Sequence, residues 1–166
     1  SMPGWILDEL AAVIGAELEL ADVVAGLSQP ARLAGRVNLR RGTREEVAAL
    51  LVAEGATVEL APGSAAGLLI DGLGDPGESA SHRVGRWTVQ DLGAQRVAVR
   101  ATPAAGHHVL DACAGVGGKS THLAELADDA ARIDAVDRST TKLALATAAA
   151  RRLGLASIRT LVADLQ

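Results

Sequence analysis

Residues 109–119 read VLDACAGVGGK, a short apolar run followed by a glycine-rich turn. Three glycines, Gly115, Gly117 and Gly118, allow the backbone of the turn to approach a ligand closely. The helix expected to start at Lys119 presents free N–H groups that favour a negatively charged group. The segment therefore predicts a strand–turn–helix unit with a ligand site at the turn.

The second half of the chain continues this unit as a strand-then-helix rhythm. The predicted strands are 109–112, 133–137 and 158–163, and the predicted helices are 90–100, 119–126 and 139–152. Ser139 is placed as a helix N-cap and Gly154 as a C-cap. Alternation of this kind is typical of α/β proteins with a Rossmann-like parallel sheet.

The first half predicts a small α+β module. Apolar spacing indicates helices at 5–14 and 20–27, and strands are expected at 36–40, 58–60 and 68–70. Thr43 with Glu46 forms a capping-box pattern for a helix that Gly55 ends. Residues 71–86 read as a turn-filled connection. We expect a module at 1–80 and the first half of the Rossmann-like domain at 81–166.

Three aspartates fall at or just after the expected strand ends. Asp137 lies 22 residues beyond Gly115, the spacing at which a carboxylate accepts hydrogen bonds from the ribose hydroxyls of an adenosine cofactor. Asp111 precedes the turn, and Asp164 could reach the adenine amine. A phosphate-binding loop is the rival hypothesis, but it requires glycine where Cys113 stands.

These motifs resemble the Sun/Fmu family of RNA cytosine-C5 methyltransferases. The resemblance runs in order through PGW at 3–5, RVNLR at 36–40, VQD at 89–91, the glycine turn, Asp137 and Asp164. The family turn commonly reads LDxCAAPGGKT, so Gly115 and Val116 stand here where Ala and Pro are common. The resemblance implies a class I methyltransferase sheet, S-adenosyl-L-methionine as cofactor and RNA, chiefly rRNA, as partner.

The candidate contacts form two sets. Those for the cofactor are Asp111, Ala114, Gly115, Gly117, Gly118, Lys119, Asp137 and Asp164. Those for RNA phosphate or sugar are Arg36, Asn38, Arg40 and Arg41, since arginine forms bidentate pairs with phosphate. A solvated basic strand is the alternative interpretation of the second set.

The resemblance also implies that the catalytic cysteines follow the third strand, beyond Gln166. We therefore expect this polypeptide alone to be inactive, and a non-catalytic RNA-binding or scaffold module is the alternative function. Cys113 is expected to be a small buried residue without a catalytic role. With the first strand at a sheet edge, a homodimer or a complementing fragment is expected to pair there.

Composition narrows the class of protein. With 49% hydrophobic residues and only two aromatic ones, Trp5 and Trp87, the core must be built mainly from Leu, Val, Ile and Ala. The scarcity of aromatics disfavours an RNA-stacking platform. No apolar run reaches membrane-spanning length and a single cysteine allows no disulfide, so a soluble, cytoplasmic protein without a metal site is expected.

Overall fold

The computed structural model describes residues 2–15, 18–29 and 32–164, and the chain divides into two compact units, 1–31 and 32–166. In the first unit, α1 spans Gly4–Val13 and α2 spans Leu20–Leu27, which confirms both predicted helices. Neither helix buries a residue, and Trp5 is 69% exposed. The described part of this unit therefore has no buried core of its own.

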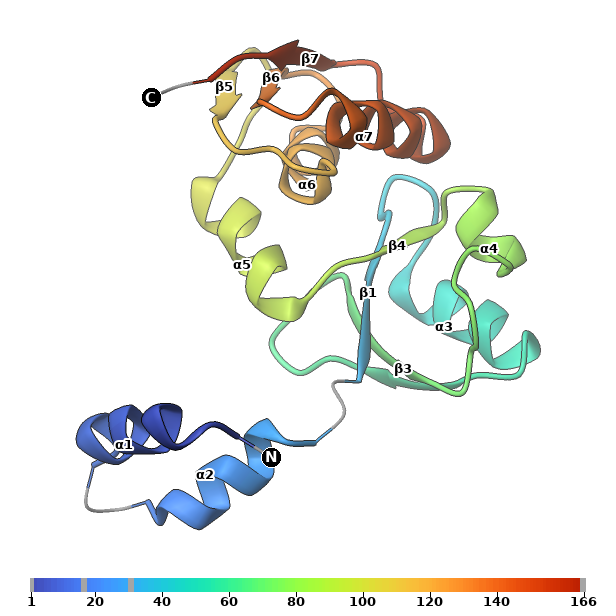
Figure 1. The fold of residues 1–166 in the computed structure, drawn as a ribbon. Helices are drawn as coiled ribbons and strands as arrows, with labels where there is room; N and C mark the ends of the chain where they lie inside the picture. The colour runs from blue at the N-terminus through green and yellow to red at the C-terminus, as the bar shows by residue number, and fades with distance from the viewer. Residues whose placement is uncertain (1, 16–17, 30–31, 165–166) are drawn as a thin grey trace. The chain divides into compact units, whose positions relative to one another are not determined.

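The second unit begins with an antiparallel sheet, sheet A, in the strand order β2-β3-β1-β4 (Figure 1). The strands are β1 (Leu33–Val37), β2 (Thr57–Leu60), β3 (Gly67–Asp71) and β4 (Trp87–Val89). Val47 and Leu51 of α3 (Arg44–Ala53) pack with Leu68 and Trp87 in one buried cluster. The first module is thus a sheet with a helix packed against it.

The capping box that starts α3 is confirmed. The Thr43 hydroxyl accepts from the Glu46 N–H at 3.1 Å, and the Glu46 carboxylate accepts from the Thr43 N–H at 2.9 Å. Two N–H groups that have no partner inside the helix are thereby satisfied. The helix ends at Ala53, and Gly55 follows with φ +95°.

The predicted strand at 36–40 is displaced: β1 ends at Val37. Asn38 stops it, because its side-chain oxygen accepts from the Arg40 N–H at 3.2 Å and its carbonyl accepts from the Arg41 N–H at 2.9 Å. An asparagine that bonds its own following backbone in this way favours a turn over a strand. Residues 38–41 therefore form a turn.

The predicted connection at 71–86 is also wrong in part, because it contains a helix and leads directly into β4. Ser79 caps α4 (Ala80–Arg83) by accepting from the His82 N–H at 3.1 Å. Trp87 then pairs with Val37 of β1 and is fully buried. These elements are too short for periodicity to reveal them, and sheet A consequently continues past residue 80.

The remaining residues form a parallel sheet, sheet B, in the order β5-β6-β7. Its elements are β5 (His108–Asp111), α6 (Gly118–Leu126), β6 (Arg132–Asp137), α7 (Thr140–Leu153) and β7 (Ile158–Val162). Figure 1 shows α5 (Leu92–Ala101) leading from β4 toward this sheet. The predicted α/β rhythm is confirmed, as are the Ser139 and Gly154 caps of α7.

The core of sheet B is made of aliphatic side chains, many of them alanine. Ala98, Ala124, Ile133 and Leu153 are all fully buried in one cluster between α5, α6, α7 and the sheet. This agrees with the expectation of a core built from aliphatic residues. Within the described ranges, no helix has the length and apolar character that crossing a membrane requires.

Candidate cofactor-binding site

The three aspartates singled out in the sequence lie at one edge of sheet B. Asp111 is the last residue of β5 and Asp137 the last of β6, while Asp164 follows two residues after Val162, the end of β7. Asp137 is in register with Val162. Because all three strands are parallel, their carboxyl ends meet at the same edge, where open α/β sheets bind ligands.

The glycine turn after β5 is fastened to the end of β6. The Ala114 N–H donates to the Val136 carbonyl at 2.9 Å, and the Gly115 N–H donates to the Asp137 carboxylate at 2.9 Å. Gly115 and Gly117 have φ angles of +56° and +82°, a left-handed region that glycine adopts without strain. The turn and the second carboxylate are therefore one structural unit.

Two glycines of the turn have different reasons to lack a side chain. A Cβ at Gly117 would lie 2.7 Å from the Ala146 Cβ, so this glycine allows α7 to pack against the turn. A Cβ at Gly115 would meet nothing within 4 Å. Gly115 thus leaves open space beside the Asp137 carboxylate.

Asp137 is held in the ionised form. Its other oxygen accepts from the Ser139 N–H at 2.8 Å, and this bond, followed by that from Gly115, lowers the pKa of Asp137 below its ordinary value. A carboxylate with both oxygens oriented by backbone donors is a fixed acceptor. It can accept further hydrogen bonds, because each oxygen carries two lone pairs.

The remaining residues of the predicted set lie around the start of α6. Asp111 accepts from the buried Ser120 hydroxyl at 2.6 Å, and Lys119 is exposed. The N-cap of α6 is Gly117, which has no side chain to accept hydrogen bonds from the first N–H groups of the helix. Cys113 was expected to be buried, but it is exposed. It lies in the turn after β5 and does not belong to the apolar clusters of sheet B.

This geometry fits an adenosine cofactor that ends in a carboxylate. The ionised Asp137 at the end of β6 suits hydroxyl donors. The open side of Gly115 admits a close approach, and the helix N-terminus suits an anion. The described residues contain no group of three or more His, Cys, Asp or Glu side chains suited to a metal ion.

Comparisons with known proteins agree with this geometry. Residues 98–166 match the family described as 16S rRNA methyltransferase RsmB/F, and residues 2–75 match its ferredoxin-like domain. The probable ribosomal RNA small subunit methyltransferase B of Synechocystis is 35% identical over 166 residues, covering 99% of this chain and 37% of that protein.

The chain belongs to the Sun/Fmu family of RNA methyltransferases.

Solved structures of similar fold extend over nearly the whole chain. PH0851 superimposes with a TM-score of 0.91 at 26% identity, covering 98% of this chain and 36% of that one. NSun6 from Pyrococcus horikoshii, solved with SFG, gives a TM-score of 0.86 at 17% identity, covering 98% and 65%. The chain thus spans a little over a third of the length of the Synechocystis relative and of PH0851.

In this member of the Sun/Fmu family, Arg36 lies between the two sheets and not at the surface. It is 0% exposed, and its guanidinium donates to both Glu125 oxygens at 2.9 Å and to the Thr121 hydroxyl at 3.1 Å. It also donates to the Gly118 carbonyl at 3.0 Å and to the Gln90 side chain. Arg36 therefore joins β1 to the helix that starts in the glycine turn.

Asn38 has a similar position. It is buried, and its amide donates to the Leu153 carbonyl at 3.0 Å and the Gly85 carbonyl at 3.2 Å. Arg40 and Arg41, by contrast, are exposed, although Arg40 pairs with Asp128 at 2.8 Å and Arg41 donates to the Val84 carbonyl at 2.7 Å. The predicted RNA set is thus divided between two buried and two exposed residues.

Sequence reasoning missed two further polar contacts between the sheets. Gln90 donates to the Gly118 carbonyl at 3.1 Å, so this carbonyl receives two side chains from the first module. Arg152 of α7 donates to the Trp87 carbonyl at 2.9 Å and the Thr88 hydroxyl at 2.9 Å. Gln90 lies in the VQD motif at 89–91, but local spacing does not reveal the partner of either residue.

Proposed function

We propose that this chain is the S-adenosyl-L-methionine-binding part of an RNA cytosine-C5 methyltransferase that acts on small-subunit rRNA. The observation that carries the proposal is the open Gly115 beside the ionised Asp137, in a chain of an RNA methyltransferase family. The name of the Synechocystis relative supports rRNA as the substrate class. The division of roles between residues 1–80 and 81–166 stays a prediction.

Each residue at the edge of sheet B has a proposed task. Asp137 accepts from the ribose hydroxyls, Asp164 accepts from the adenine amine, and the N-terminus of α6 binds the methionine carboxylate. Asp111, through its bond to Ser120, positions the start of α6. When bound, the cofactor supplies an electrophilic methyl group.

For RNA, the exposed Arg40 and Arg41 are the proposed phosphate contacts from the original set. Their existing bonds to Asp128 and to the Val84 carbonyl hold the guanidinium groups in place and leave donors for a phosphate. Burial of Arg36 and Asn38 supports a different role for them, that of holding β1 against α6 and α7.

Calorimetry of the full chain tests the cofactor assignment. We expect S-adenosyl-L-methionine and its demethylated product to bind and ATP with magnesium to give no signal. Binding of ATP alone would support the phosphate-loop hypothesis, and no binding by any of the three would leave the scaffold alternative. The product is a useful probe because it lacks the reactive methyl group.

A matched pair of glycine variants localises the binding. Gly115→Asn places a side chain in open space at φ +56°, and Gly106→Asn does the same at φ +80° in the turn before β5. Asparagine tolerates the left-handed region, so both variants should fold. We expect Gly115→Asn to weaken cofactor binding at least tenfold and Gly106→Asn to leave it unchanged. Equal affinities would place the cofactor elsewhere.

A further inference from the structure

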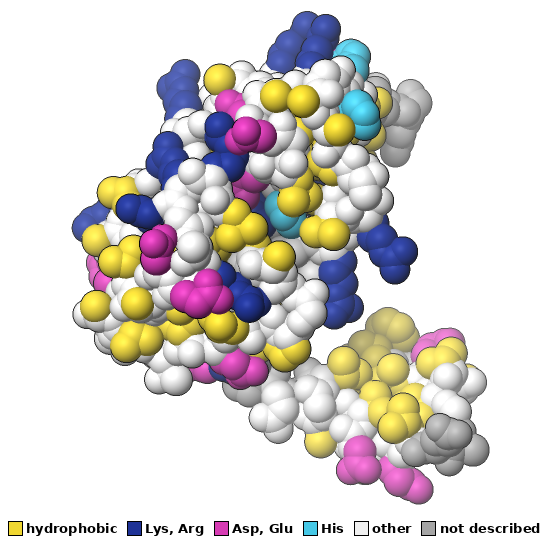
Figure 2. Space-filling model, turned by 180° about the vertical axis from the view of Figure 1, so that it is seen from behind, with side chains coloured by type: hydrophobic (Ala, Val, Ile, Leu, Met, Phe, Trp, Pro, Cys, Tyr) yellow, Lys and Arg dark blue, Asp and Glu magenta, His cyan; other side chains and the backbone are white. Residues whose placement is uncertain are grey.

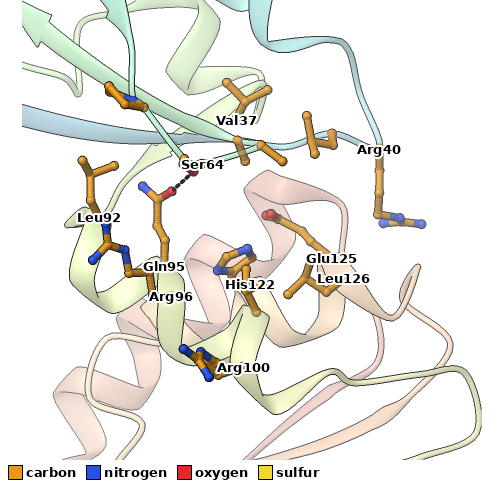
Figure 3. A pocket seen from close by; sticks show the side chains of 16 residues that line it. Val37, Arg40, Ser64, Leu92, Gln95, Arg96, Arg100, His122, Glu125 and Leu126 are labelled. Atoms are coloured by element: carbon orange, nitrogen blue, oxygen red, sulfur yellow. Dashed lines mark hydrogen bonds between the residues drawn. The ribbon is translucent and has the colours of Figure 1, made fainter.

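A cavity of about 330 Å³ lies between sheet A and the helices α5 and α6. Its walls come from the end of β1, the loop between β2 and β3, and one face of each helix (Figure 3). None of its lining residues belongs to the candidate cofactor site. The volume is within the range of roughly 300–1,000 Å³ that is usual for small-molecule pockets.

His122 of α6 is the unusual side chain in this cavity. It is 3% exposed, and its Nδ1 atom is buried without a hydrogen-bond partner among the described residues. Figure 3 shows its ring between Gln95 and Glu125. Buried polar atoms are nearly always bonded, so an unbonded one requires an explanation.

The polar neighbours of His122 are already engaged. Gln95 donates to the carbonyls of Gly35 and Gln90 at 3.1 and 2.9 Å and accepts from Ser64 at 3.3 Å. Both oxygens of Glu125 bind Arg36. Burial, with the Arg36 charge adding to it, lowers the pKa of His122 to about 3, so the ring is neutral at pH 7 and offers one donor and one acceptor.

The rest of the cavity combines an apolar wall with positive charge. Leu92, Val99 and Leu126 contribute the apolar surface. Arg96 and Arg100 of α5 are exposed and form no ion pair within the described part of the chain. Figure 2 shows hydrophobic side chains around a histidine, with Lys and Arg groups nearby. Because Arg36 offsets the charge of Glu125, the apolar wall and the two arginines favour an anionic ligand with an apolar body.

We propose that this cavity binds one unstacked nucleotide of the RNA substrate. The base lies against Leu92, Val99 and Leu126, its edge bonds to His122, and Arg96 and Arg100 hold the adjoining phosphates. The two arginines are four residues apart, about 6 Å along the helix axis, which suits neighbouring phosphates of one strand. Proteins that recognise RNA by sequence commonly bind unstacked bases in this manner. The inference rests on RNA being the substrate, as proposed above.

Fluorescence anisotropy with a short labelled single-stranded RNA tests the phosphate contacts. We expect the double variant Arg96→Gln and Arg100→Gln to bind at least fivefold more weakly. The slope of the logarithm of the RNA association constant against the logarithm of the salt concentration should decrease in magnitude by about 1.4. This is the value for two phosphate contacts on a single strand. The control is Arg151→Gln with Arg159→Gln, which removes the same charge from exposed residues outside the cavity. Equal affinity and slope in the two double variants would overturn the proposal and favour a protein side chain as the occupant.

His122→Leu tests the base contact. Leucine fills a similar volume and leaves no unbonded polar atom, so this variant should fold. We expect it to weaken binding of the intact oligonucleotide about threefold or more, while binding of an abasic oligonucleotide stays at the parent value. Equal losses for both oligonucleotides would overturn the assignment of His122 to the base.

The calorimetric experiment separates this inference from the proposed cofactor site. If the parent chain binds S-adenosyl-L-methionine but no RNA, the cavity inference fails and the cofactor assignment stands. If RNA binding depends on Arg96 and Arg100 while no cofactor binds, the cavity inference stands and the cofactor assignment fails.

Discussion

Sheet A and sheet B bury different kinds of residue. The core of sheet A is built from large side chains, including Trp87, Leu51 and Ile70, whereas the core of sheet B is rich in alanine. Sheet A nevertheless contains the fully buried Arg36, which ends in a polar network on α6 of sheet B. The comparison teaches that the two sheets are apolar inside but are joined to each other largely through charge and hydrogen bonds.

Breaking the polar contact between the two sheets should have the largest effect on stability. Arg36→Met leaves the Glu125 carboxylate buried without its partner, and we expect a loss of about 3–5 kcal/mol in the free energy of unfolding. Urea unfolding followed by circular dichroism measures it. The double variant Arg36→Met with Glu125→Leu should recover most of the loss, because no uncompensated charge remains.

Arg32 is the matched control for Arg36. It also lies in the first module and pairs with Glu59 and Asp71, but its side chain is 40% exposed. Surface pairs contribute little, so Arg32→Met should lower the free energy of unfolding far less than Arg36→Met does. Similar losses for the Arg32 and Arg36 variants would contradict the view that the buried pair joins the sheets.

The close packing within sheet B predicts the next largest effect. Gly117→Ala combines a left-handed φ of +82° with a Cβ 2.7 Å from Ala146, and we expect a loss of about 2–4 kcal/mol. Gly106→Ala has a φ of +80° but open space, so it should lose only about 1 kcal/mol. Thermal unfolding compares the two, and equal losses would mean that α7 moves away without penalty.

The smallest predicted effect is a pH dependence at the boundary between the sheets. Because the folded protein lowers the pKa of His122 to about 3, the unfolded chain, with a pKa near 6.5, takes up the proton more readily. Stability is therefore lost as pH falls below about 6.5. Between pH 7 and pH 5 the parent should lose about 2 kcal/mol more than His122→Leu in urea unfolding. Equal losses would mean that the His122 ring takes up a proton in the folded state as readily as in the unfolded chain.

Much of sheet B could be predicted from local signals. The glycine turn, the Ser139 and Gly154 caps and the apolar strands are each specified within a few residues, and the elements lie where these signals indicate. Sheet A was harder to predict, because the partners of β1 in β3 and β4 are 30 or more residues away in the sequence. The displaced end of β1 shows the difficulty, since one asparagine turn overrides a run that is otherwise compatible with a strand.

The positions of the candidate cofactor residues could be predicted more fully than those of the candidate RNA contacts. Backbone spacing places acids at the ends of parallel strands, so Asp111 and Asp137 could be assigned from position alone. An arginine in a strand gives no sign of whether it meets solvent or a distant carboxylate. Arg36 and Arg40 are four residues apart in one motif, yet one is buried and the other is exposed.

The parallel α/β half, its glycine turn and its line of carboxylates follow from the amino-acid sequence alone, because they depend on periodicity, caps and backbone freedom that act over short distances. What the polar residues of the first half do depends on the folded protein. The burial of Arg36 against Glu125 and the placement of the His122 ring in a cavity arise where α6 meets sheet A. Contacts between segments so distant in the chain are set by packing, which no local pattern encodes.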